Sequence, residues 1–206
     1  PTQNIGEITM DWKNKILWVG TGENNSSRSS YSGIGILKTE PNGSNWANVG
    51  LTDSHHIGKI LINPTNKDHV IVGVTGHLYS KNKNRGVYVT KDGGSTWKKT
   101  LFIDDGTGII DLAYTPNSFN IMYATAWEKD RKAWNLNEGG KGSAIYKSID
   151  AGSTWTKMTD EKSGFPTGSG IGRIGLATFS NEVVYALLDN QFMRPEKEKK
   201  KADGLQ

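Results

Sequence analysis

The chain has 206 residues, of which 34% are hydrophobic, and it contains 25 glycines and 7 tryptophans. This length is sufficient to bury a substantial core, and the composition is typical of short strands joined by tight turns, which argues against a helical bundle. The lack of cysteine excludes disulfides, thiolate metal sites and a cysteine nucleophile. No apolar run is long enough to span a membrane.

The net charge of +4 is concentrated near the carboxyl end of the sequence. Residues 194–201 contain five basic and two acidic side chains, so this segment carries +3 and the remainder of the chain about +1. A nucleic-acid footprint would need basic residues gathered on one face of the fold, so no nucleic-acid partner is expected. Residues 194–206 are interpreted as a charged tail or the start of an insertion.

A repeated strand pattern runs along the chain. Four segments that start Ile-Gly or Ile-Ile alternate apolar and other residues, with spacings of 52, 52 and 62 residues; they are 5–8, 57–60, 109–112 and 171–174. Each is followed by a polar turn and a second apolar strand, at 16–20, 70–74, 121–125 and 183–187. The second strands are apolar at nearly every position, which predicts sheets buried on both faces.

Each unit is closed by a recurring turn. Residues 86–97 and 144–155 share the pattern Ser/Thr-x-Asp-x-Gly-Ser-Thr-Trp, and residues 35–46 form a third copy with Pro41 in place of the aspartate. We expect the carboxylate to accept backbone N–H groups of its own turn and the Trp to cover the base of the hairpin. The residues expected to have this structural role are Asp92, Gly94, Thr96, Trp97, Asp150, Gly152, Thr154, Trp155 and Trp46.

A unit of about 50 residues with an inner, second, third and outer strand is one blade of a β-propeller. The chain then holds about three and a half blades, at residues 4–55, 56–107 and 108–165 with a half blade at 166–191, all within residues 1–193. Propellers close with four to eight blades. We therefore expect an all-β, partial propeller of a larger, seven-bladed assembly, completed by blades from the same parent polypeptide or from another copy.

The turn motif resembles the Asp-box, or BNR repeat, of sialidases, two-propeller xyloglucanases and the sortilin/Vps10 domain. A longer likeness, carried by residues 17–24, 49–60 and 76–88, is to bacterial sortilin-like BNR-repeat proteins that are labelled "glycosyl hydrolase". This resemblance implies a longer protein that is exported to the periplasm, cell surface or extracellular space.

Function is expected on the loops opposite the Asp-box turns, because sites on a β scaffold usually lie on such loops. The aromatic side chains there are suited to stacking on sugars or gripping a peptide, although they could instead fill the junctions between blades. The candidate ligand-binding residues are Asn24, Tyr31, His55, His56, His77, Tyr79, Arg85, Trp127, Arg131 and Trp134.

Glu23 is the leading candidate for a catalytic acid. It lies near the position where the xyloglucanases carry a catalytic aspartate in a Thr-Asp motif, although this sequence reads Thr21-Gly22-Glu23. Glycoside hydrolysis needs a second carboxylate roughly 5–10 Å away, for which Asp53 is the candidate, with Asp104 and Asp105 as alternatives. A sialidase would need an arginine triad, and Arg173 alone does not supply one. The alternative reading of Glu23 is a carboxylate that caps its own loop.

The histidines of the same loops are a weaker candidate for a metal site. His55, His56 and His77 could meet on one rim, but adjacent side chains of an extended segment point in opposite directions. We therefore expect hydrogen-bonding loop histidines, with no metal and no cofactor. Overall the sequence favours an exported binding or scaffold module that recognises a peptide, protein or glycan, and a glycoside hydrolase acting on a polysaccharide is the alternative.

Overall fold

The computed structural model describes residues 4–193 except for residues 42 and 44. The predicted tail or insertion at residues 194–206 lies outside the described residues. The described chain is all-β apart from one short 3-10 helix, η1 (Thr52–Ser54). The predicted fold class is therefore confirmed at this level.

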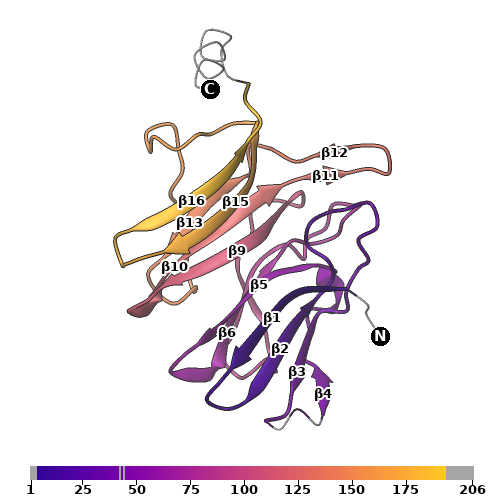
Figure 1. The fold of residues 1–206 in the computed structure, drawn as a ribbon, viewed down its shortest axis with the longest axis vertical. Coiled ribbons are helices and arrows are strands. Elements are labelled where there is room, and N and C mark those ends of the chain that lie inside the picture. Colours follow the sequence, from indigo (N-terminus) through magenta and orange to yellow (C-terminus); the bar gives the residue numbers. More distant parts are fainter. Residues whose placement is uncertain (1–3, 42, 44, 194–206) are drawn as a thin grey trace, which may run out of the picture.

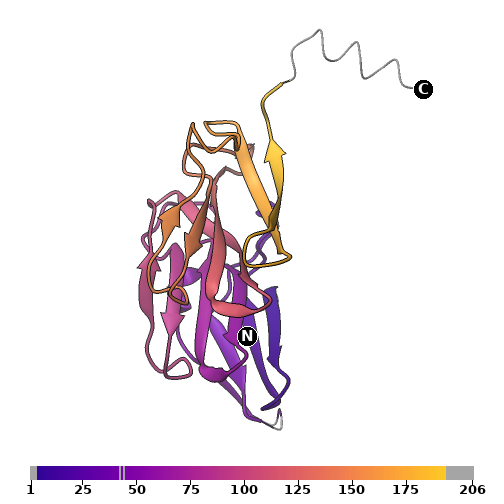
Figure 2. The same ribbon diagram turned by 90° about the vertical axis from the view of Figure 1, so that its left-hand side faces the viewer.

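The strands form consecutive antiparallel sheets, which follow one another in chain order from indigo to yellow (Figures 1 and 2). The first sheet contains β1 (Ile5–Asp11), β2 (Ile16–Thr21), β3 (Ile36–Thr39) and β4 (Trp46–Asn48). The second contains β5 (Ile57–Asn63), β6 (Asn66–Val74), β7 (Gly86–Thr90) and β8 (Lys98–Leu101). The third contains β9 (Thr107–Thr115), β10 (Ser118–Glu128), β13 (Ala144–Ser148) and β14 (Thr156–Lys157). The fourth pairs β15 (Ile171–Thr178) with β16 (Val184–Asn190), and β11 (Asp130–Arg131) forms a separate hairpin with β12 (Leu136–Asn137).

Strand order within each four-stranded sheet is the predicted sequence of inner, second, third and outer strands. The strands are longer than the sequence pattern indicated. β6 and β10 begin at Asn66 and Ser118, inside segments expected to be turns, because pairing continues to Asn63↔Asn66 and Thr115↔Ser118. Continued pairing satisfies backbone groups that a longer turn would leave to solvent.

The core lies between the sheets rather than within one of them. In β6, Val70, Val72 and Val74 pack in a cluster with residues of the first sheet, including Trp18. Ile71, on the opposite face of the same strand, packs in a cluster with residues of the third sheet, including Ile109. The prediction of strands buried on both faces is therefore confirmed for the second sheet.

The inner strands approach one another closely, which explains the Ile-Gly start of the repeat. A Cβ atom placed on Gly58 of β5 would lie only 2.7 Å from the carbonyl oxygen of Ile109 in β9. A Cβ atom on Gly6 of β1 would overlap the carbonyl oxygen of Ile57 in β5 in the same way. Glycine is required because the backbones of neighbouring sheets are almost in contact at the inner edge.

The Asp-box carboxylates have the predicted role. Asp92 accepts the backbone N–H of Thr96 at 2.9 Å and the Thr90 hydroxyl at 2.7 Å. Hydrogen bonds from the side chains of Thr96 and Thr90 lower the pKa of Asp92 to about 2. Burial opposes the same effect at Asp150, but hydrogen bonds from Thr154 and Ser148 still lower its pKa to about 2. Both carboxylates are exposed, but their oxygens are used by hydrogen bonds within their own turns.

The Asp-box tryptophans differ from the prediction, because they connect neighbouring sheets as well as covering a hairpin. The indole N–H of Trp97 donates to the carbonyl oxygen of Val49, in the segment after the first sheet, at 2.7 Å. The indole of Trp155 lies 3.2 Å from the hydroxyl of Thr100 in β8. Trp46 is 53% exposed, because among the described residues no sheet precedes the first one.

The substitution Asp150→Ala should lower the free energy of unfolding by about 1–2 kcal/mol, since it removes several hydrogen bonds at an exposed turn. The folded pKa of about 2 lies below the ordinary value of 3.8, so the contribution of Asp150 is complete above about pH 4 and is lost as the pH falls towards 2. Urea unfolding from pH 6 to pH 2 measures both effects. Asp130→Ala, at another exposed aspartate, is the control, and a difference from wild type that stays constant with pH would contradict this account.

Candidate functional site

The loops divide between the two ends of the sheets, as the strand order predicts. At one end the Asp-box turns lie beside the first hairpins, since Gly93 donates its backbone N–H to Asp68 at 3.0 Å and Ala151 to Asn120 at 3.1 Å. The opposite end, called the loop face below, is built by residues 22–35, 49–56, 75–85, 102–106, 129–143 and 158–170. Contacts between these loops include the Tyr79 hydroxyl, which donates to the carbonyl oxygen of Arg28 at 2.7 Å.

The loop face brings together two of the predicted histidines and one predicted acid. His77 Nε2 lies 3.3 Å from Asp53 Oδ1, and His55 Nε2 lies 3.7 Å from the same oxygen. The rings of His55 and His77 stack with their centroids 3.7 Å apart. Burial, followed by the charge of His77, lowers the pKa of His55. The cluster therefore joins η1 and the residues after it to the β6–β7 loop.

A cavity of about 310 Å³ opens beside this cluster. Tyr31 and Tyr79, both exposed, border it together with the two clustered histidines. Its lining residues are Ser30, Tyr31, Ser32, His55, His56, His77, Leu78, Tyr79 and Ser80. The cavity thus combines aromatic and hydroxyl groups from three separate loops.

Three of the predicted ligand-binding residues are buried, which differs from the expectation of exposed contacts. Arg85 donates to the carbonyl oxygens of Thr75 at 2.6 Å and His77 at 2.8 Å, so its guanidinium holds the β6–β7 loop. The indole of buried Trp127 donates to Glu138 at 2.7 Å. Burial lowers the pKa of His56 to about 4, and its ring faces the interior. These side chains shape the loops and fill junctions between them.

The remaining candidates lie apart from the cavity. Asn24 donates its amide to the carbonyl oxygens of Gly6 at 3.0 Å and Gly58 at 3.3 Å, which ties the first sheet to the second. Trp134 is 84% exposed, and with Arg131 it belongs to the β11–β12 hairpin, which extends away from the sheets (Figure 1). Neither Trp134 nor Arg131 lines the cavity that Tyr31 and Tyr79 border.

The candidate catalytic carboxylates are each bonded within the loops. Glu23 accepts the backbone N–H of Asn25 at 2.5 Å and the hydroxyl of Ser30. Asp53 accepts the side-chain amide of Asn84 at 2.5 Å in addition to its histidine contacts. This arrangement is the one expected of a loop-capping carboxylate, which was the alternative reading of Glu23.

A second cavity of about 340 Å³ gathers other acids of the loop face. Asp104 and Asp105, the alternative partners for Glu23, line it with Glu128 and Asp130. Asp104 accepts the backbone N–H groups of Gly106 and Thr107, both at 2.7 Å, and Glu128 accepts that of Gly142 at 2.7 Å. Asp105 pairs with Lys81 at 3.4 Å.

Lys129 is a buried cation that the sequence did not single out. Its ammonium group lies 4.9 Å from the ring centroid of Trp127 and bonds the hydroxyl of Ser26, which belongs to the first sheet's loop. Burial, followed by the charge of Arg85, lowers its pKa to about 7. Arg173 also reaches that loop, donating to Asn25 at 2.8 Å. Lys129 lies in a run of charged residues whose other members include exposed ones, so no local pattern marks it.

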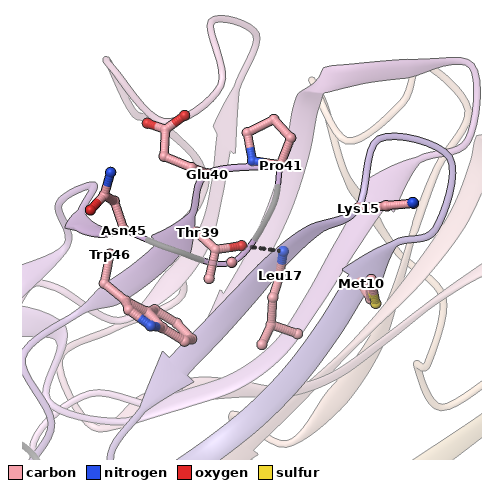
Figure 3. Close-up of a pocket in the computed structure, with 9 residues that line it drawn as sticks. Met10, Lys15, Leu17, Thr39, Glu40, Pro41, Asn45 and Trp46 are labelled. Carbon is pink, nitrogen blue, oxygen red and sulfur yellow. Dashed lines mark hydrogen bonds between the residues drawn. The ribbon is translucent and has the colours of Figure 1, made fainter.

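A third cavity, of about 1000 Å³, lies at the Asp-box end on the open side of the first sheet (Figure 3). Met10, Leu17 and Trp46 contribute its apolar lining. Met10 pairs with Leu17 as Ile62 pairs with Val70 in the second sheet. Val70 is covered by the first sheet. The cavity therefore lies on the surface of the first sheet that corresponds to this sheet-to-sheet contact in the second sheet.

Comparison with known proteins gives a fold but no family. No family model matches the sequence, and no curated protein matches it either. Solved structures do match: an ancestral GH74 enzyme has a TM-score of 0.57 at 16% identity, over 86% of this chain and 20% of that chain. The GH74 xyloglucanase from Xanthomonas campestris has a TM-score of 0.53 at 16% identity, over 82% of this chain and 24% of that chain. YCF48 from Cyanidioschyzon merolae has a TM-score of 0.54 at 18% identity, over 92% of this chain and 49% of that chain.

These proteins are β-propellers, and the likeness confirms the partial β-propeller predicted from the repeat. The chain spans between a fifth and a half of the length of those three proteins. Membership of the sortilin-like BNR family is not confirmed. No helix in the described part of the chain is long and apolar enough to cross a membrane.

The burial of Lys129 makes a pH dependence of stability testable. Its folded pKa of about 7 lies below the ordinary 10.5, so the unfolded chain binds the proton more tightly and the contribution of Lys129 to stability rises from pH 7 to about pH 10. The substitution Lys129→Met should therefore stabilise the protein most at pH 7 and below, with a gain that shrinks towards pH 10. Denaturant unfolding at intervals of one pH unit measures it. Lys132→Met, at an exposed lysine, is the control. A gain in the free energy of unfolding that does not change with pH would contradict the lowered pKa of buried Lys129.

Proposed function

We propose that this chain is part of an exported β-propeller whose loop face binds a peptide, a protein or a glycan. Its blades would comprise residues 4–55, 56–107 and 108–165 with a half blade at 166–191. The observation that carries the proposal is the contrast between acids and aromatics on the loop face. Glu23 and Asp53 accept hydrogen bonds from neighbouring loop groups, and the rings of Tyr31 and Tyr79 are exposed beside a cavity, with the Tyr79 hydroxyl donating to Arg28.

The composition of the cavity supports recognition rather than bond cleavage. Tyrosine offers a large apolar face with a polar tip, and it is enriched where proteins contact partners. Serine hydroxyls and histidine nitrogens next to the two rings provide hydrogen-bonding groups for a polar ligand. A glycan ring or an extended peptide presents both an apolar face and hydrogen-bonding groups, so either one suits this lining.

Glycoside hydrolysis of a polysaccharide is the second candidate function. Two of the similar solved structures are named GH74 enzymes, one of them a xyloglucanase. The cavity that contains Asp104, Asp105, Glu128 and Asp130 supplies several carboxylates on the loop face. Asp104 and Glu128 accept backbone N–H groups, whereas Asp105 and Asp130 form ion pairs with Lys81 and Lys132.

Glycan and peptide arrays probed with the chain separate the two functions. We expect a specific ligand whose affinity falls at least about tenfold in Tyr79→Ala, because truncating an aromatic contact removes most of its binding energy. Tyr185→Ala, at an exposed tyrosine of β16, is the matched control and should bind as wild type does. Turnover of an oligosaccharide that disappears in Glu23→Gln would instead establish the hydrolase, and binding unaffected by Tyr79→Ala would contradict the proposed face.

We also propose that the open side of the first sheet is covered by a further blade, from the same parent polypeptide or from another copy. Leu17 and Trp46 line that side; their counterparts in the second sheet are Val70, which is buried, and Trp97, which is partly buried. Exposure of this open side of the first sheet should make the 206-residue chain self-associate. Light scattering across a range of concentrations measures this, with Leu17→Asp expected to shift the mass towards that of the monomer. A stable, soluble monomer at every concentration would contradict the proposal.

A further inference from the structure

We propose that Asp53, His55 and His77 form a binding site for a divalent transition-metal ion such as Zn²⁺. The sequence argued against a metal because neighbouring histidines point apart, and the structure bears out that divergence for His56, which is buried. The third ligand comes from Asp53 instead. The carboxylate lies two residues before His55, and the irregular segment between them turns both groups towards His77.

The separations between the ligand atoms suit such an ion. One atom from each residue lies within 4.8 Å of the other two. Asp53 Oδ1 lies 3.3 Å from His77 Nε2 and 3.7 Å from His55 Nε2. A tetrahedral Zn²⁺ with bonds of about 2.0–2.1 Å separates its ligand atoms by roughly 3.3–3.4 Å. The two imidazole rings stack with an interplanar angle of 16°, so an ion between the three groups requires one ring to rotate until the two Nε2 lone pairs converge.

The outer atoms of two of these ligands are already oriented. His77 Nδ1 lies 3.1 Å from the hydroxyl of Ser80, and Asp53 Oδ2 accepts the amide of Asn84 at 2.5 Å. Metal-binding imidazoles and carboxylates commonly use their remaining polar atom in this way, which fixes the ring or carboxylate in the ligating position. Ser80 and Asn84 would thus form the outer layer of the site.

The backbone that carries the ligands is held in an unusual conformation. Leu51 and His55 flank η1 with positive φ values of 54° and 57°, which residues with a side chain rarely adopt; Leu51 is left-handed helical, and His55 lies outside that region. His77 is fixed from the other side, because its carbonyl oxygen accepts the buried guanidinium of Arg85. The ligands are therefore presented by two loops whose positions are set independently of any ion.

The identity and accessibility of the ligands define the class of ion. Two imidazoles with one carboxylate suit Zn²⁺, Cu²⁺ or Ni²⁺, whereas Mg²⁺ and Ca²⁺ prefer oxygen alone. Asp53 is exposed and borders a further cavity of about 340 Å³, which is lined by Leu51, Thr52, Asp53, Ser54, Asn84 and Tyr88. Three protein ligands leave a coordination position open to water or to a polar ligand. This site does not depend on the proposed binding of peptide or glycan.

Calorimetric titration of the 206-residue chain with ZnCl₂ tests the proposal. We expect one ion per chain, with affinity reduced about 100-fold or more in His77→Gln, Asp53→Asn and His55→Asn, the last chosen because asparagine is among the residues enriched at positive φ. Ser80→Ala should weaken binding by about tenfold. His69→Gln, at a histidine of β6 outside the loop face, is the matched control and should bind as wild type does.

A measurement on the unmodified chain guards against variants that fail to fold. Electron paramagnetic resonance of the chain with one equivalent of Cu²⁺ should show hyperfine coupling to two imidazole nitrogens. Circular dichroism of each variant verifies its fold before titration. The proposal is overturned if the wild-type chain shows no saturable one-to-one binding, if folded His77→Gln and His55→Asn bind as tightly as wild type, or if the copper spectrum lacks nitrogen coupling.

Discussion

Packing of each sheet against the next is the interaction on which the rest of the structure depends. A single four-stranded sheet is too thin to bury a core, so β6 places apolar side chains on both faces and shares them with the sheets on either side. The same requirement explains the glycines of the inner strands, where Gly58 lets β5 approach the backbone of β9. The Asp-box tryptophans add polar links across these contacts, from Trp97 to Val49 and from Trp155 to Thr100.

This packing also separates the folding devices from the candidate site. Antiparallel order places the Asp-box turns at one end of the sheets and the long connections at the other, so the repeated turn motif and the polar loops occupy different ends. The stacked sheets then hold the loops of successive units side by side. Asp53 meets His77, and Lys129 meets Ser26 across more than a hundred residues of sequence, because sheets fix the anchor points of each loop.

The polar groups of the loop face have two kinds of role. Arg85, Trp127 and Asn24 use their hydrogen-bonding atoms on backbone carbonyls, so they maintain loop shape. Tyr31, Tyr79 and the Asp53–His55–His77 cluster border cavities open to solvent, and the Tyr79 hydroxyl also donates to the backbone carbonyl of Arg28. Residue type alone does not distinguish these roles, because an arginine or a tryptophan suits a binding surface as well as a buried junction. Burial separates Arg85 and Trp127 from the exposed Tyr31 and Tyr79, and it is decided by packing between units.

The sequence by itself determined the all-β class, the strand order within a unit and the hydrogen bonds of Asp92 and Asp150, since these features depend on residues close together in the chain. It also indicated that His55 and His56 diverge, which follows from backbone geometry. Only the tertiary structure decided that Arg85 is buried, that Trp97 reaches the preceding sheet, that Lys129 is enclosed and that Asp53 joins two histidines. These outcomes depend on how one sheet packs on the next. A local pattern of residues does not specify the distances between loops, because those loops are brought together by the packing of separate sheets.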